Sequence, residues 1–270
     1  MEKIILLSFL FLATKPVYSQ YDSLNRVEIL KHVEYVSITE ALKNPTEVHW
    51  LFINNQDIKS YLPQLDKFTN LEFLSLIQCG LQEIPEEIFS LKKLKYLNLN
   101  YNEIWLIPKE IQELTNLREL RLHGNKFITL PSNRVSEIPV EIQSLKNLKV
   151  LDLSFNKFQK IPLNLFKVTS LEKLDLEMNR LQSVDPMIGN LTNLIDLNLS
   201  SNGLYELPKE AAKLSELKEL DISKNRFQNI PEPLLGLNSI KRVKIGYNKI
   251  NVTKEEKEDI VNTYPFIKFY

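Results

Sequence analysis

Residues 94–116 read LKYLNLNYNEIWLIPKEIQELTN, and this stretch decides the fold because its pattern returns along the chain. The next unit begins 23 residues later at Leu117, on the template L-x-x-L-x-L-x-x-N-x-L-x-x-I-P-x-x-I-x-x-L-x-x. A fixed period of this length predicts stacked coils. Nine units, the last of them degenerate, are spaced by 23 residues except for a fourth interval of 31, and they begin at Val48, Leu71, Leu94, Leu117, Leu148, Leu171, Leu194, Leu217 and Ile240.

Each unit predicts one short strand and one return segment. Leu97 and Leu99 are two residues apart, so both point to the same side of a strand. Apolar residues from Ile104 to Leu114 then recur at spacings of three and four, as in a helical or 3-10 segment that packs inward. One coil cannot bury its apolar face alone, and stacking buries it in a continuous core. The template resembles the leucine-rich repeat, which implies an α/β, right-handed solenoid with a parallel sheet on its concave face.

The ninth position of each unit is occupied by a polar or small residue. We expect its amide side chain to point inward and to satisfy backbone groups where the chain leaves the strand. Cys79, the only cysteine, occupies this position in the second unit, so it is predicted to be a small buried residue rather than a nucleophile. Asparagine occupies the position in the last seven units, at Asn102, Asn125, Asn156, Asn179, Asn202, Asn225 and Asn248.

Segments outside the repeats complete the predicted organisation. The first residues carry Lys3 and an apolar run, IILLSFLFLA, followed by Val17-Tyr18-Ser19, which is typical of a secretory signal peptide; a buried core strand or helix is the alternative. The run is too short to span a bilayer. Capping-box patterns at Ser37–Glu40 and Thr253–Glu256 predict helices that cover the two ends. The predicted parts are a signal peptide (1–19), an N-terminal segment and cap (20–47), the solenoid (48–252, with an eight-residue insertion near 130–137) and a C-terminal cap (253–270).

The caps point to a narrower family. The leader SITEALKNPTEV at 37–48, the return beginning Lys109-Glu110-Ile111, and the ending from Glu255 to Pro265 resemble the leptospiral leucine-rich-repeat proteins. This resemblance covers roughly residues 37 to 270. It implies an exported or surface-associated protein, and several members of the family are thought to bind host-cell components. The 31-residue unit and the aromatic first units depart from the family pattern.

The strand positions that flank the inward leucines form the expected binding face. Positions three, five, seven and eight of each unit project from the concave side, and the first units place large apolar residues there. Exposed aromatic clusters commonly mark protein interfaces. Two interpretations stay open: these residues bind a partner, or the N-terminal cap or residues 21–36 fold over them. The residues are Trp50, Phe52, Phe73, Ile77, Tyr96 and Tyr101.

The later units place acidic residues on the same face. Asp152, Asp175, Glu177 and Asp221 are the candidates, and they would favour a basic partner surface by speeding encounter. A calcium site between Asp152, Asp175 and Glu177 is conceivable, since Ca²⁺ takes carboxylate oxygens. A solvated acidic face that needs no ligand is the stronger alternative.

Composition excludes several classes of function. The 34 basic and 34 acidic residues cancel, so no net charge draws the chain to nucleic acid. No cofactor loop is present, and the three histidines lack metal-ligand spacing. The leading prediction is a secreted or cell-surface protein, assumed monomeric, that binds a host surface, matrix or envelope protein. A carbohydrate binder, with Trp50 and Tyr96 stacking on sugar rings, is the alternative. An enzyme is less favoured: the repeat spacing makes His123 and Asp152 candidate neighbours, but no activated nucleophile accompanies them.

Overall fold

The computed structural model describes residues 34–127 and 138–269. The chain divides into two compact units, Met1–Glu34 and Tyr35–Tyr270, and nearly all described residues belong to the second. The predicted signal peptide at 1–19 and the predicted insertion at 130–137 lie outside the described residues, as do residues 21–33. Within the described ranges, no helix has the length and apolar character to cross a bilayer.

One sheet of eleven strands runs through the described chain, and its strand order is the order along the sequence. Neighbouring strands from β2 to β11 pair in parallel, and each unit position pairs with the same position of the next unit, as in Trp50↔Phe73↔Tyr96. This confirms the predicted solenoid. The strands are β1 (Glu34–Tyr35), β2 (Trp50–Phe52), β3 (Phe73–Ser75), β4 (Tyr96–Asn98), β5 (Glu119–Arg121), β6 (Val150–Asp152), β7 (Lys173–Asp175), β8 (Asp196–Asn198), β9 (Glu219–Asp221), β10 (Arg242–Lys244) and β11 (Ile267–Lys268).

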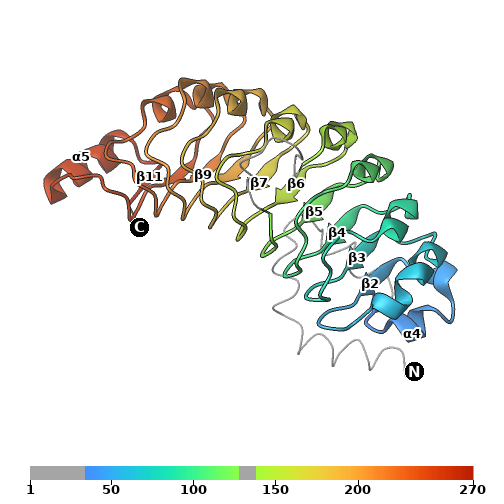
Figure 1. Cartoon of the computed structure of the whole chain (residues 1–270). Coiled ribbons are helices and arrows are strands. Elements are labelled where there is room, and N and C mark those ends of the chain that lie inside the picture. The colour runs from blue at the N-terminus through green and yellow to red at the C-terminus, as the bar shows by residue number, and fades with distance from the viewer. Residues whose placement is uncertain (1–33, 128–137, 270) are drawn as a thin grey trace, which may run out of the picture. The chain divides into compact units, whose positions relative to one another are not determined.

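Short 3-10 helices form the return of each coil. In the unit Tyr35–Tyr270 the strands line the inner side of the arc and the 3-10 helices line the outer side (Figure 1). Proline precedes most of them, because its fixed φ suits a position whose N–H is not needed by the sheet. They are η1 (Pro45–Glu47), η2 (Lys59–Lys67), η3 (Glu86–Ser90), η4 (Lys109–Glu113), η5 (Val140–Ser144), η6 (Leu163–Lys167), η7 (Pro186–Asn190), η8 (Lys209–Lys213) and η9 (Glu232–Gly236).

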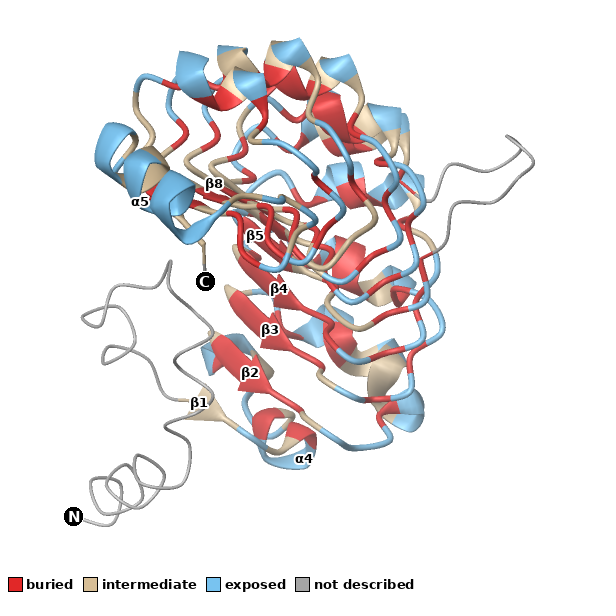
Figure 2. Cartoon of the chain, turned by 90° about the vertical axis from the view of Figure 1, so that its left-hand side faces the viewer, coloured by how far each residue is buried: buried red, intermediate tan, exposed pale blue. Residues whose placement is uncertain are grey.

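The core lies between the strands and the returns. Leucines at the first, fourth and sixth unit positions are buried from coil to coil, as Leu94, Leu97 and Leu99 show. Strands β2, β3 and β4 are buried at all three of their residues and appear in red in Figure 2. The predicted asparagine ladder is confirmed: the Asn102 amide accepts hydrogen bonds from two backbone N–H groups and donates to three carbonyl oxygens. Cys79 is buried beside this ladder, and burial raises the pKa of its thiol.

Two helices cap the ends of the stack. Helix α4 (Ile38–Ala41) begins after Ser37, whose hydroxyl accepts a hydrogen bond from the Glu40 N–H. Helix α5 (Lys254–Thr263) begins with the reciprocal capping box predicted at Thr253 and Glu256. After α5 the chain adds one more strand, since β11 pairs with β10 and covers the edge of the sheet.

Candidate functional site

The predicted aromatic patch is buried in the structure. The side chains of Trp50, Phe52, Phe73 and Tyr96 are 3%, 7%, 0% and 8% exposed. They come from β2, β3 and β4, and the expectation that these four rings offer an exposed binding surface is wrong. Ile77 is half-buried, and only Tyr101 is well exposed, at 54%.

Mutual stacking accounts for part of this burial. The Phe73 ring lies 5.2 Å from the Trp50 ring, 4.6 Å from Phe52 and 5.9 Å from Tyr96, measured between centroids, and all three pairs are stacked. Parallel pairing in register places these rings on one side of adjacent strands, where large side chains contact one another. The rings therefore behave as a second, smaller core on the sheet. The carbohydrate alternative required a sugar to stack on Trp50 or Tyr96. Both rings are buried, so neither is exposed for such stacking.

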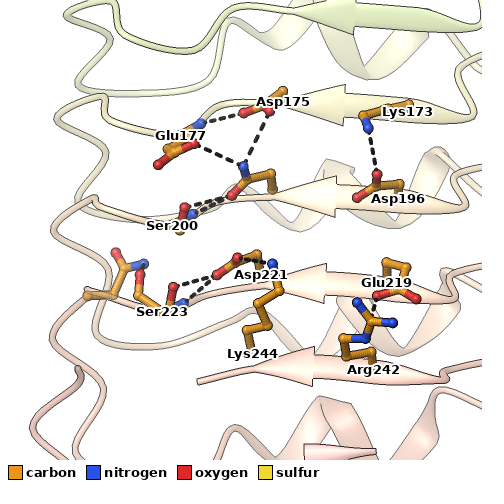
Figure 3. Close-up of polar contacts among 12 residues, drawn as sticks. Lys173, Asp175, Glu177, Asp196, Ser200, Glu219, Asp221, Ser223, Arg242 and Lys244 are labelled. Carbon is orange, nitrogen blue, oxygen red and sulfur yellow. Dashed lines mark hydrogen bonds and ion pairs between the residues drawn. The ribbon is translucent and has the colours of Figure 1, made fainter. Parts of the chain in front are cut away.

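The acidic residues toward the C-terminal end of the sheet are matched by cations on a neighbouring strand. Figure 3 shows Lys173 beside Asp196, Arg242 beside Glu219 and Lys244 beside Asp221, with N···O distances of 2.9, 3.4 and 3.1 Å. Each pair occupies the same unit position on adjacent coils. Asp221, one of the predicted binding residues, is thus already in an ion pair.

Three carboxylates differ from these pairs. Asp152, Asp175 and Glu177, named here the carboxylate cluster, have no ion pair with any residue in the described parts of the chain. Arg121 lies opposite Asp152 in the register but forms its ion pair with Glu119. The structure therefore leaves negative charge concentrated on β6 and β7.

Asp175 shows the effect of this concentration. Burial, and then the neighbouring charge of Asp152, raise its pKa from 3.8 to about 7. The Glu177 N–H donates to Asp175 Oδ1 at 2.9 Å, and the Asn198 amide donates to Asp175 Oδ2 at 3.3 Å and to Glu177 Oε2 at 3.4 Å (Figure 3). These neutral donors position the carboxylates without neutralising them.

Replacing Asp175 with asparagine should stabilise the protein at high pH. The folded-state pKa of Asp175 lies above the unfolded value, so ionisation between about pH 4 and pH 7 lowers the free energy of unfolding. We expect Asp175→Asn to raise the free energy of unfolding by about 1–3 kcal/mol at pH 8, a range that allows for solvent screening of the charge. At pH 5 the effect should be smaller, because Asp175 is then mostly protonated in the folded state. Urea unfolding at the two pH values measures it.

The ion-paired Asp221 supplies the control for this measurement. Asp221→Asn removes the carboxylate that pairs with Lys244, so it should not stabilise the protein at pH 8. An Asp175→Asn effect of the same size at pH 5 and pH 8 would contradict the argument, because only the ionised form is penalised.

A hydrogen-bonded chain joins His123 to the carboxylate cluster. His123 Nε2 lies 2.9 Å from the Tyr101 hydroxyl and His123 Nδ1 lies 2.7 Å from Ser154 Oγ. The Ser154 hydroxyl donates to Asp152 Oδ1 at 2.5 Å. Burial lowers the pKa of His123, which opposes the raising effect of Asp152 and Glu177. The sequence predicted that His123 and Asp152 are neighbours but missed Ser154, which lies between them.

This chain does not have the order of a hydrolytic triad. In such a triad the carboxylate holds the histidine, which takes a proton from the serine. Here Asp152 accepts directly from Ser154, and Ser154 is only 3% exposed. The arrangement orders side chains on the sheet and gives no accessible nucleophile.

The carboxylate cluster does not form a metal site in the described chain. Nowhere in residues 34–127 and 138–269 do three His, Cys, Asp or Glu side chains come together in a way that would hold a metal ion. The calcium site considered between Asp152, Asp175 and Glu177 therefore has no support from the geometry.

Comparison with known proteins identifies the family of the repeats. The family model described as leucine rich repeat matches residues 69–127, 128–181, 169–227 and 192–250. A solved leucine-rich-repeat protein of Leptospira interrogans is 28% identical, with a TM-score of 0.66, and the match covers 88% of this chain and 70% of that one.

The second solved relative is more distant. The leucine-rich-repeat ectodomain of the receptor kinase GASSHO1/SCHENGEN3 of Arabidopsis thaliana, in complex with Casparian strip integrity factor 2, is 24% identical with a TM-score of 0.55. That match covers 83% of this chain and 30% of the receptor chain, and it shows a shared fold alone. Among curated proteins no match was found.

Proposed function

Because this chain belongs to the leucine-rich-repeat family, whose repeats form a protein-interaction module, we propose that it is an exported binding protein. Its partner is a host surface, matrix or envelope protein, held on the concave face of the sheet. The signal-like N-terminus supports the choice of location, and the likeness to the Leptospira protein supports the leucine-rich-repeat scaffold.

The carboxylate cluster is the observation that favours a binding role most. The raised pKa of Asp175 means that its ionisation lowers the free energy of unfolding, so the carboxylate does not serve stability at neutral pH. In the neighbouring coils, by contrast, acidic residues form ion pairs with cations. Charges arranged in this way steer a complementary partner and fix its orientation. The leucine-rich-repeat fold serves typically as a binding scaffold, and no catalytic family matches.

Binding and its location can be tested with isosteric, charge-neutral variants. The triple variant Asp152→Asn/Asp175→Asn/Glu177→Gln should bind immobilised matrix or envelope proteins at least about tenfold more weakly than the unaltered chain, a loss of roughly 1.4 kcal/mol. Surface plasmon resonance at low and physiological salt measures it. Glu206→Gln/Glu216→Gln/Glu232→Gln removes three exposed carboxylates from the return side and should change the affinity less than about twofold.

Equal losses in the two triple variants would mean that net charge, and not the concave face, controls binding. Competition by free glycans but not by proteins would favour a carbohydrate ligand instead.

Export has a separate readout: expression of the full chain with a bacterial secretion apparatus should give a product that begins at Gln20 and lies outside the cytoplasm. An uncleaved chain inside the cell would contradict export.

A further inference from the structure

Large aromatic or methionine side chains occupy the eighth position of four units, where the backbone is left-handed; one of them, Tyr247, lies in the last unit and the other three in the middle of the solenoid. Tyr101, Phe155 and Met178 have φ values of 56°, 54° and 49° and are 54%, 41% and 45% exposed. The left-handed region favours glycine and asparagine, and larger side chains adopt it at an energetic cost. Asn55 and Gly124 occupy the same position in other coils, so the fold itself does not require aromatic or methionine side chains there.

Tyr101 belongs to the third coil and Phe155 to the fifth, and His123 of the fourth coil lies between their rings. The Tyr101 N–H donates to the His123 carbonyl, and the Phe155 N–H donates to the Glu177 carbonyl. The His123 ring lies 4.7 Å from the Tyr101 ring and 4.5 Å from the Phe155 ring, between centroids. We name Tyr101, His123, Phe155 and Met178 the edge ridge, because it follows the carboxyl ends of β4 to β7.

Gly124 leaves space for the Tyr101 ring to pack over the fourth coil. A Cβ atom at this position would lie 2.8 Å from Tyr101 Cδ1, inside van der Waals contact. Because Gly124 has no side chain, the Tyr101 ring can lie against His123. There the Tyr101 hydroxyl joins the hydrogen-bonded chain that continues through His123 to Ser154 and Asp152. The ridge is therefore a built surface with a fixed ring geometry.

The carboxylate cluster adjoins the ridge. Asp152 joins His123 through Ser154, and Glu177 directly precedes Met178 in the chain. The nearest strands on the C-terminal side pair their acids with Lys and Arg, whereas the described chain supplies no ion pair to these three carboxylates. Exposed apolar groups and carboxylates without an ion pair in the described chain thus meet at the carboxyl ends of β6 and β7.

We propose that the edge ridge and the carboxylate cluster together dock a basic segment of a protein partner. A lysine or arginine of that segment ion-pairs with the cluster, and its stem and an adjacent apolar side chain pack on Phe155 and Met178. A cation gains from both features, since charge-assisted hydrogen bonds to carboxylates are strong and aromatic faces attract cations. Aromatic side chains that protrude from a rigid frame are efficient anchors. The inference rests on the proposed function and specifies its site.

A peptide library tests the proposal without knowledge of the partner. A randomised dodecapeptide library displayed on phage is selected on the full chain and depleted on the double variant Phe155→Asn/Met178→Asn. Asparagine tolerates the left-handed backbone, so the variant should melt at or above the temperature of the unaltered chain. The surviving peptides should be enriched in Lys and Arg, and a synthetic copy with citrulline or acetyl-lysine at those positions should bind at least about tenfold more weakly.

The outcomes separate this inference from the proposed function. Tyr247→Asn, at the same unit position but 77% exposed and at the far end of the sheet, should leave binding of these peptides unchanged. Surviving peptides without excess basic residues, no peptide that discriminates against the double variant, or equal loss with Tyr247→Asn would each overturn the docking site. A matrix or envelope protein that binds the double variant as tightly as the unaltered chain would overturn it too while leaving the proposed function intact.

Discussion

Replacing Asn102 with alanine is expected to lower the free energy of unfolding by about 3–5 kcal/mol. Its amide oxygen accepts from the N–H groups of Cys79 and Leu81 at 2.9 and 3.1 Å. Its amide nitrogen donates to the carbonyl oxygens of Leu76, Leu99 and Asn100 at 2.7 to 3.2 Å. Each buried group left without a partner costs about 1–3 kcal/mol, and water that enters the space recovers part of the total.

Urea unfolding of the full chain measures the effect, and Asn193→Ala is the matched control. The Asn193 amide also donates to a backbone carbonyl of the preceding coil, Thr169 O at 2.8 Å, but it is exposed. Water can replace it there, so the control should lose about 1 kcal/mol or less. Similar losses for the two variants would show that the inward ladder contributes no more than a surface hydrogen bond does.

The sequence was sufficient for the features that depend on spacing alone. Leucines two residues apart predict the strand, and their recurrence predicts the register in which Leu74, Leu97 and Leu120 pair. The inward asparagines and the capping box at Thr253 follow from local chemistry in the same way. These features repeat in every coil or depend on four consecutive residues, so no long-range information was needed.

The candidate site depended on information that spacing does not carry. A strand position that points away from the core is solvent-facing only if nothing else covers it, and the exposure of Phe73 could not be read from its period. The Ser154–His123 contact spans 31 residues across the longest unit. The left-handed backbone did leave a signal, because Gly124 and Asn55 share the unit position of Tyr101 and Phe155. Comparison of that position between units would have found the edge ridge.

The buried rings of the first coils lead to the second large effect. Phe73→Ala should lower the free energy of unfolding by about 3–4 kcal/mol, because the ring is fully buried and stacks on three neighbours. Phe73→Leu keeps most of the apolar volume and should cost about 1–2 kcal/mol. Thermal melts followed by circular dichroism, together with urea titrations, give both values.

Tyr205→Ala distinguishes core packing from the general loss of an aromatic side chain. Tyr205 is 57% exposed on the return side, and its removal should change the stability by less than about 0.5 kcal/mol. If Phe73→Ala also changed stability this little while abolishing binding to a protein partner, the rings would be an interface and not a second core. A large loss of stability for Phe73→Ala alone would assign the rings of β2–β4 to the fold, and binding would then have to be sought on β5–β7, where charge and exposed rings meet.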